Sequence, residues 1–257
     1  MNDQNHSLNK SSNNNLDNSL DKSFGQQSVS PSQRDQKIRS VFQLVAPRYD
    51  LMNDFMSFGT HRIWKRVFVN SIPFKASDII VDLAGGTGDI ARKLQHKGAN
   101  VVVVDPSIEM MSAGKKTHSL AVSNIAALGE RLPFTDASID KLTISFGIRN
   151  MTSMTAALQE IYRVLKPGGQ YYCLEFSRPM MPIRPFYNLY NQYIIPRLGA
   201  LVAGQPEAYQ YLIESIQRFP DQETMKALLE DAGFSDVSYR NLFFGIACIH
   251  VGTKKHS

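Results

Sequence analysis

Hydrophobic and polar positions follow two different periods along the chain. Four apolar residues recur at the spacing of one helix face: Ile38, Val41, Phe42 and Val45. This pattern predicts a helix that ends before Pro47, since proline cannot continue one. The following stretch, "YDLMNDFMSFGTHRIWKRVF", is crowded with apolar residues that do not alternate as in a strand. We expect helical turns there that form a lid.

From Ile79 onward, apolar runs alternate with helical patterns. Strands are predicted at 79–84, 100–105, 124–128, 140–147 and 170–176, with helices from about Gly88, from Ser107 and at 153–165, and a turn at "KPGG". Such alternation predicts an α/β fold with a doubly wound, mostly parallel sheet covered on both faces. Near the end, Asp221 is a plausible N-cap and Gly233 a helix stop, and the runs 236–244 and 245–254 indicate a closing antiparallel pair.

The first 34 residues differ in composition from the remaining chain. Nineteen of them are Asn, Ser or Gln, and Phe24 is the only aromatic residue. Burial of so little apolar surface cannot offset the conformational entropy that the segment would lose on folding. We therefore expect a disordered tail at 1–34. The rest of the 257-residue chain is long enough for one domain, 35–257, with the lid at 35–75 and a substrate-side insertion at 177–219.

Charge and cysteine content exclude several function classes. The net charge of +5 is mild, and without a long basic run we expect no nucleic-acid partner. Cys173 and Cys248 lie in apolar runs and are expected to be buried thiols. The histidines form no metal-binding spacing, so no metal is predicted. No segment has a signal-peptide core or the length to cross a bilayer, which predicts a cytoplasmic protein with at most peripheral contact to an anionic membrane surface.

The glycine turn "VDLAGGTGD" follows the first strand of the α/β pattern. Gly86, Gly88 and Ala91 satisfy the dinucleotide-binding form G-x-G-x-x-A, which taken alone permits a nicotinamide oxidoreductase. Asp82 beside the turn would repel a pyrophosphate and favour an ammonium or sulfonium, both of which S-adenosylmethionine carries. Asp105, after four valines, suits the ribose hydroxyls.

Several further blocks extend this pattern to a family resemblance. They are "VFQLVAPRYDLMNDFMSFGTHRIWK", "DLAGGTGD", "GERLPF", "TISFGIRN", "YRVLKPGG" and "RFPDQETMKALLEDAGF". Together and in this order, from about residue 37 to the end, they resemble the ubiquinone/menaquinone biosynthesis C-methyltransferase family, within the class I S-adenosylmethionine-dependent methyltransferases. The resemblance implies the strand order 3-2-1-4-5-7-6 and methyl transfer to a ring carbon of a polyprenylated quinol, either 2-polyprenyl-6-methoxy-1,4-benzoquinol or demethylmenaquinol.

The resemblance also implies a set of cofactor contacts. The residues implied are Gly86 and Thr87 in the turn, Asp105, the pair Leu128 and Gly129, and Ser145. Two positions depart from the usual methyltransferase pattern. Ala84 stands where the turn's first glycine is usual, and Leu128 stands where a polar residue often reaches adenine, so contact there would use backbone or apolar packing.

The catalytic candidates are Arg149, Asn150 and Tyr49, with Asp50 and His61 as further candidates. Arg149 stays charged and is a poor base, but it can hold a phenolate or polarise a water, and Asn150 can orient either. The alternative is structural: Arg149 paired with an acid, Asn150 capping a helix, and His61 buried with its hydrogen bonds satisfied.

Several readings of function and partners stay open at this point. The segment 177–219 carries many Met, Tyr, Phe and Ile residues, which either accept a polyprenyl tail or simply pack over the sheet. A methyltransferase of another small phenol or lipid, a nicotinamide enzyme and a non-catalytic subunit are the competing functions. A homo-oligomer and a complex of quinone-biosynthesis enzymes are both considered as assemblies.

Overall fold

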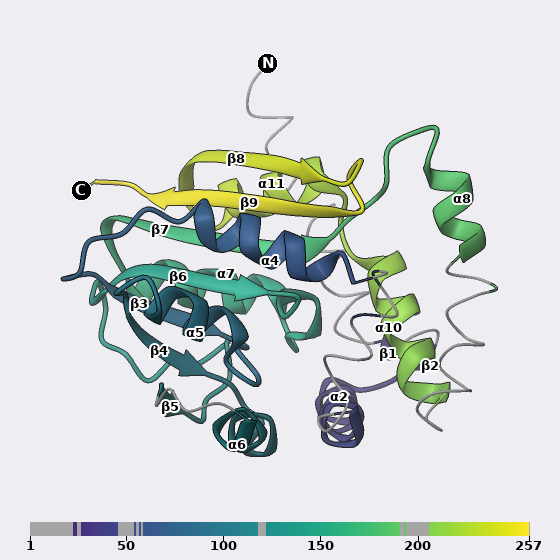
Figure 1. Cartoon of the computed structure of the whole chain (residues 1–257), viewed down its shortest axis with the longest axis horizontal. Coiled ribbons are helices and arrows are strands. Elements are labelled where there is room, and N and C mark those ends of the chain that lie inside the picture. The colour runs from purple at the N-terminus through teal and green to yellow at the C-terminus, as the bar shows by residue number, and fades with distance from the viewer. Residues whose placement is uncertain are drawn as a thin grey trace.

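A seven-stranded sheet organises the chain (Figure 1). The computed structural model describes residues 23–24, 27–45, 54, 57, 59–117, 122–190, 193 and 206–256. The strands are β3 (Ile79–Leu83), β4 (Asn100–Val104), β5 (Ser123–Ile125), β6 (Ile139–Ser145), β7 (Leu165–Phe176), β8 (Phe234–Leu242) and β9 (Ala247–Lys254). They lie in the order β5-β4-β3-β6-β7-β9-β8. Only β9 runs antiparallel to its neighbours β7 and β8, so the predicted fold and strand order are confirmed.

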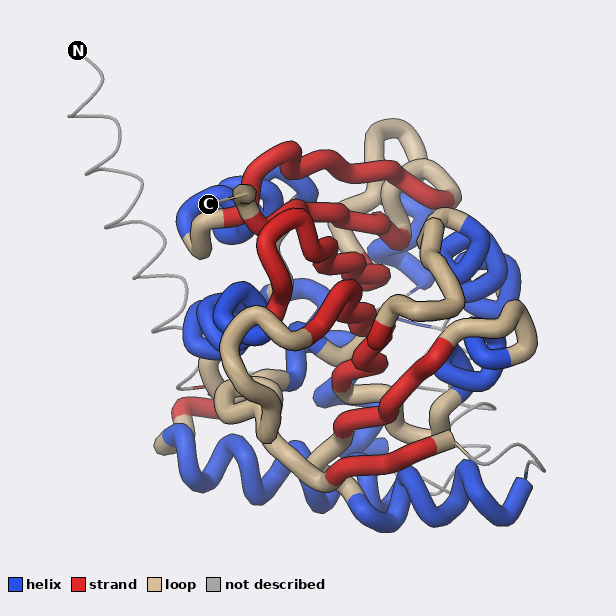
Figure 2. The backbone as a smooth tube through the Cα atoms, turned by 90° about the vertical axis from the view of Figure 1, so that its left-hand side faces the viewer, coloured by secondary structure: helices blue, strands red, loops and turns tan. Residues whose placement is uncertain are grey.

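Helices cover both faces of the sheet. The helices are α2 (Pro31–Val45), α4 (His61–Asn70), α5 (Asp89–Gln95), α6 (Ile108–Thr117), α7 (Met154–Val164), α8 (Arg184–Leu189), α10 (Pro206–Arg218) and α11 (Gln222–Asp231), with a short 3-10 turn η2 (Ile148–Asn150). Figure 1 shows α4 and α5 on one face, α7 and α11 on the other, and α2 and α10 beyond the carboxyl ends of the parallel strands. Figure 2, turned by 90°, shows the twist of the strands between these layers.

Two apolar clusters form the core, one on each face of the sheet. Trp64 and Phe68 of α4 are fully buried in the first cluster, where Trp64 meets the ring of Phe176 edge-on with centroids 6.0 Å apart. Leu158 and Ile161 of α7 belong to the second. The sequence assigned Trp64 to a lid, but the structure places it in the core, because its indole fills the space between α4 and the sheet.

The N-terminal boundary predicted at residue 34 differs from the structure. Helix α2 begins at Pro31, and two short strands, β1 (Ser23–Phe24) and β2 (Gln27–Ser28), precede it. The ring of Phe24 stacks on Tyr211 of α10, with centroids 4.5 Å apart and planes at 11°. Phe24, the one aromatic residue of this polar stretch, thus packs against the aromatic ring of Tyr211 from a helix far away in the sequence. Residues 1–22 of the predicted tail lie outside the described residues.

The other element boundaries agree with the patterns to within about two residues, except at "KPGG" and in the strand predicted at 124–128, which ends at Ile125. Asp221 caps α11 by accepting from the Thr224 amide at 3.0 Å, as predicted. Strand β7 begins at Leu165 and includes the predicted turn, because a shift of register against β6 absorbs the two glycines. Cys173 and Cys248 are buried free thiols, as expected. Among the described helices, none has the length and apolarity to cross a bilayer.

Candidate active site

The glycine turn after β3 is shaped by close approach of its neighbours. The backbone is left-handed at Ala84, Gly86 and Gly88, with φ values of 51°, 54° and 78°. A Cβ on Gly85 would lie 2.9 Å from Asp82 Oδ2, so only glycine fits there. Ala84, the departure from the usual pattern, adopts the left-handed conformation despite its side chain.

Asp105 joins the glycine turn to the end of β4. Its Oδ2 accepts from the Gly86 amide at 2.9 Å, and its Oδ1 accepts from the Ser107 amide at 2.8 Å. Burial raises the pKa of this carboxyl, while the two amide hydrogen bonds oppose the shift. Each carboxylate oxygen has a further lone pair, so Asp105 can also accept from a ligand diol.

Asp82 lies beneath the turn and does not line the ligand cavity. It is 1% exposed, and its two oxygens accept from the Ala91 amide at 3.1 Å and the Thr143 hydroxyl at 2.9 Å. Burial raises its pKa to about 7. Contrary to expectation, Asp82 is therefore not placed to select the cationic end of the ligand, but fixes the turn and the start of α5.

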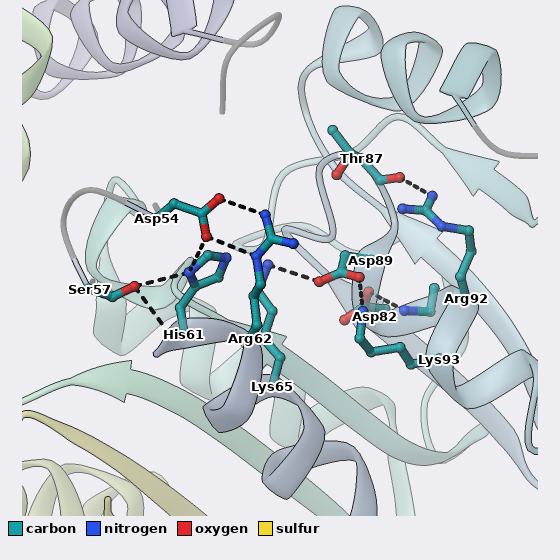
Figure 3. A network of polar contacts seen from close by, with 11 residues as sticks. Asp54, Ser57, His61, Arg62, Lys65, Asp82, Thr87, Asp89, Arg92 and Lys93 are labelled. Atoms are coloured by element: carbon teal, nitrogen blue, oxygen red, sulfur yellow. Dashed lines mark hydrogen bonds and ion pairs between the residues drawn. The ribbon is translucent and has the colours of Figure 1, made fainter. Parts of the chain in front are cut away.

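A polar network connects α4 to the start of α5 (Figure 3). Lys65, 6% exposed, lies 3.0 Å from Asp89 Oδ2, and Lys93 binds the other oxygen of Asp89. Burial alone would raise the pKa of Asp89, but the two lysines hold it well below its usual range. His61 is also buried, with Nδ1 3.0 Å from Ser57 Oγ, which favours the structural role over that of a base.

A cavity that opens to solvent lies at the carboxyl ends of β3, β4 and β6. Predicted site residues in its lining are Gly86, Asp105, Leu128, Gly129 and Asn150. The apolar side chains of Met110 and Met151 also line the cavity. The structure therefore brings five of the nine predicted residues, from four separate loops, around one space.

Three other predicted residues lie outside the lining of this cavity. Thr87 borders a smaller adjoining hollow, which Arg92 and Lys115 also line. Ser145 ends β6 with its hydroxyl buried and without a hydrogen-bond partner among the residues that the structure describes. Arg149 is only 8% exposed and is not among the residues that line the cavity. The ninth, Tyr49, and its neighbour Asp50 lie outside the described residues.

Arg149 forms the buried ion pair that the structural alternative anticipated. Its Nη1 lies 2.6 Å from Glu175 Oε1 and donates to the Phe146 carbonyl at 2.8 Å. Glu175 is 1% exposed, and burial raises its pKa despite the guanidinium beside it. Arg149 therefore fixes the turn that presents Asn150, rather than facing the cavity itself.

Three residues of this region escaped the sequence analysis. Glu175 is the penultimate residue of β7, and a lone acid near the end of an apolar strand is the same signal that identified Asp105. Tyr211, 3% exposed, donates to Asn150 Oδ1 at 2.9 Å. Arg34, 4% exposed, donates to the backbone carbonyls of Arg149 and Met151. No sequence signal marked Arg34, because it stands in a polar segment.

Comparison with known proteins identifies close relatives over most of the chain. Residues 31–254 match the ubiE/COQ5 methyltransferase family. The chain is 56% identical over 233 residues to the ubiquinone/menaquinone biosynthesis C-methyltransferase UbiE of Rubrivivax gelatinosus, covering 91% of this chain and 93% of that protein. It is 43% identical over 274 residues to the mitochondrial 2-methoxy-6-polyprenyl-1,4-benzoquinol methylase of Gallus gallus, covering 90% and 88% respectively.

Solved structures share the fold at much lower identity. A possible histamine N-methyltransferase from Thermotoga maritima aligns with a TM-score of 0.63 at 20% identity, covering 85% of this chain and all of that one. The [4+2]-cyclase SpnF aligns with a TM-score of 0.64 at 14% identity, covering 87% and 97%. Fold alone therefore does not specify the reaction, whereas the sequence match does. The chain belongs to the ubiE/COQ5 methyltransferase family.

Proposed function

We propose that this protein transfers a methyl group from S-adenosylmethionine to a ring carbon of a polyprenylated quinol in ubiquinone or menaquinone biosynthesis. The acceptor is 2-polyprenyl-6-methoxy-1,4-benzoquinol, demethylmenaquinol or both. The observation that carries the proposal is the family match over residues 31–254, together with a cavity at the strand ends that contains Asp105 and the glycine turn.

The lining of the cavity fits this methyl donor. Asp105 offers free lone pairs to a ribose diol, and the apolar wall at Leu128 and Gly129 suits an adenine ring. Gly86 and Thr87 would border the remaining part of the donor, with Ser145 beneath it. When bound, the donor supplies an electrophilic methyl group on sulfur. The protein's contribution is to align that group with the ring, and alignment of reacting groups supplies about 7–11 kcal/mol in well-oriented systems.

The acceptor end of the site lies at η2. Asn150 faces the cavity and can donate to a ring oxygen, while Arg149 fixes the turn through Phe146 and Glu175. Donation to a ring oxygen favours the ionised quinol, whose carbon is the better nucleophile. Tyr49 remains a candidate for contact with the ring.

Replacing Asp105 by Asn is expected to weaken binding of S-adenosylmethionine by about 1.5–3 kcal/mol, the range for a hydrogen bond to a charged group. The amide also provides one acceptor where the carboxylate serves two backbone amides, so the turn loses support. Isothermal titration calorimetry measures the change. Asp236→Asn on the edge strand β8, at a left-handed position that Asn tolerates, is the matched control. Unchanged affinity in Asp105→Asn would mean that the ribose lies elsewhere.

The proposed activity is tested with methyl-labelled S-adenosylmethionine and two acceptors, a short-tail methoxybenzoquinol and a demethylmenaquinol, under reducing conditions. We expect label in the ring of at least one. Donor binding without transfer to either quinol would favour another phenol or lipid as acceptor, or a non-catalytic role. Thermal stabilisation by NAD but not by S-adenosylmethionine would favour the nicotinamide alternative.

An exposed apolar surface near α8 supports peripheral contact with a membrane. Its residues are Met180, Met181, Phe186, Leu189, Phe243 and Phe244, each at least 44% exposed. The Met180 amide donates to the Phe244 carbonyl at 2.8 Å, so the loop before α8 and the β8–β9 turn are contiguous. Arg178 and Arg184 belong to the same loop and helix.

We infer that this surface meets an anionic bilayer on its cytoplasmic side, where a polyprenyl tail would be dissolved. The labelled-methyl assay includes long-tail quinol in anionic vesicles, where we expect faster turnover than in detergent. Self-association and membership of a quinone-biosynthesis complex stay open proposals.

A further inference from the structure

The η2 turn is fixed by two segments that lie outside the α/β core. From α2, Arg34 donates Nη2 to the Arg149 carbonyl at 3.2 Å and Nη1 to the Met151 carbonyl. From α10, Tyr211 donates its hydroxyl to Asn150 Oδ1 at 2.9 Å. The backbone and the side chain of this turn are therefore set by different helices.

The hydrogen bond from Tyr211 determines which end of the Asn150 amide is available. Burial raises the pKa of Tyr211 to about 12, so its hydroxyl remains a donor at physiological pH. The amide oxygen of Asn150 thus faces Tyr211, and its nitrogen donates to the Phe146 carbonyl at 3.5 Å, its one hydrogen bond among the described residues. In the flipped orientation the amide oxygen would face that carbonyl, and two acceptors repel. The group that Asn150 can offer to the cavity is therefore an N–H donor.

The Tyr211 ring itself is held rigidly. It stacks on Phe24 at 4.5 Å and is 3% exposed, so its hydroxyl has little freedom to move. The Phe146 carbonyl on the other side of the amide is also fixed, since Arg149 donates to it and Phe146 adopts a φ of 57°. A non-glycine residue in the left-handed region is a strained conformation that structures retain mostly at functional sites.

We propose that Tyr211 is a positioning residue for methyl transfer, which orients the Asn150 amide so that its NH2 group donates to the ring oxygen of the bound quinol. The inference rests on the proposed function, because it assigns a role within the acceptor end of the same site. Asn150 is the residue that touches the substrate, and Tyr211 acts through it.

The chemistry requires a donor at this point. The ring hydroxyl ionises by releasing its proton to water, and N–H donation stabilises the resulting oxyanion. The ring carbon then forms its bond to the methyl group as the bond from that methyl group to sulfur breaks, and the ring loses its C–H proton to water. The hydroxyl oxygen regains a proton, so one proton is released for each methyl group transferred. An Asn150 side chain that presented its oxygen would instead oppose ionisation of the quinol.

The test measures kcat between pH 6 and 10 for Tyr211→Phe in the full-length protein, with S-adenosylmethionine and a short-tail methoxybenzoquinol. We expect kcat at neutral pH to fall roughly 10- to 100-fold, as for loss of a hydrogen bond to a charged group. The acid limb of the profile should move up by at least about one pH unit, since each unit corresponds to about 1.4 kcal/mol. The KM for S-adenosylmethionine should change little.

A second variant separates orientation from mere structural support. Asn150→Asp can still accept from Tyr211 but presents an oxygen in place of the NH2 group, so it should lose activity as Asn150→Ala does. Tyr211→Phe combined with Asn150→Ala should be no worse than Asn150→Ala alone. Tyr172→Phe, which removes a buried hydroxyl bonded to Gln170 on β7, is the matched control and should keep normal activity.

Three outcomes would overturn the inference: a loss in Tyr211→Phe that is equal at every pH, full activity of Asn150→Asp, or additive losses in the double variant. Failure of the proposed function is distinguishable, because the unmodified protein would then transfer no methyl group in the same assay. Circular dichroism and thermal melting confirm that each variant is folded.

Discussion

The variant Arg149→Met is expected to lose about 3–5 kcal/mol of unfolding free energy, the cost of leaving one partner of a buried ion pair alone. Glu175 is 1% exposed, and within the described part of the chain its Oε2 has no hydrogen-bond partner even with Arg149 in place. Removing the guanidinium leaves a buried carboxylate without its charged partner, held by backbone hydrogen bonds from Phe176, at 2.9 Å, and from residue 149. Urea denaturation followed by circular dichroism measures the loss.

The same variant should show a characteristic dependence on pH. Burial raises the pKa of Glu175 above its ordinary value of 4.5, and loss of Arg149 raises it further. A carboxyl with a raised folded-state pKa favours the folded state fully below its unfolded pKa, and that contribution is lost as pH rises through the folded pKa. The deficit of Arg149→Met should therefore be larger at pH 8 than at pH 5.

The control is the double variant Arg149→Met/Glu175→Gln. Its neutral side-chain amide at position 175 can still accept the hydrogen bond from the Phe176 amide, and no charge is left unpaired. The double variant should recover most of the lost stability. If Arg149→Met is as stable as the unmodified protein at pH 8, the pair does not have the buried geometry described above.

The variant Gly114→Ala is expected to destabilise the protein by about 1–3 kcal/mol, although alanine normally stabilises a helix relative to glycine by about 1 kcal/mol. A Cβ at this position of α6 would lie 2.1 Å from the Thr87 carbonyl oxygen and 2.7 Å from its carbon. Both are backbone atoms that cannot rotate away, so α6 or the glycine turn must move. Since the turn borders the donor site, affinity for S-adenosylmethionine should fall as well.

The matched control is Ser112→Ala, an exposed position on the same helix, which should leave both stability and affinity unchanged or slightly improved. Thermal melting and calorimetry on the two variants provide the comparison. Equal behaviour of Gly114→Ala and Ser112→Ala would contradict the close contact between α6 and the turn.

The family relationship is stronger evidence of function than the fold. A cyclase and N-methyltransferases share this sheet at less than 25% identity, so the strand order alone leaves the chemistry undecided. The proposed specificity for a quinol depends instead on the sequence match and on the residues at the carboxyl ends of β4 and β6.

The amino-acid sequence by itself predicted the parallel sheet, its family resemblance implied the strand order, and five of the nine predicted site residues line one cavity. The continuous apolar strands, the glycine turn and Asp105 are local signals, because each depends on neighbours a few residues away in the chain. Asp105, Leu128 and Asn150 converge because the carboxyl ends of parallel strands necessarily share one edge.

Only the tertiary structure decided what each charged group contacts. Asp82 and Arg149 were expected at the ligand, but Thr143 and Glu175, each from a neighbouring strand, turn them into structural supports. Arg34 and Tyr211 reach η2 from segments 115 and 61 residues away. Side-chain periodicity indicates which face of a helix or strand is buried. The partner of a buried charge depends instead on how helices and strands pack against one another, and no local sequence pattern contains that information.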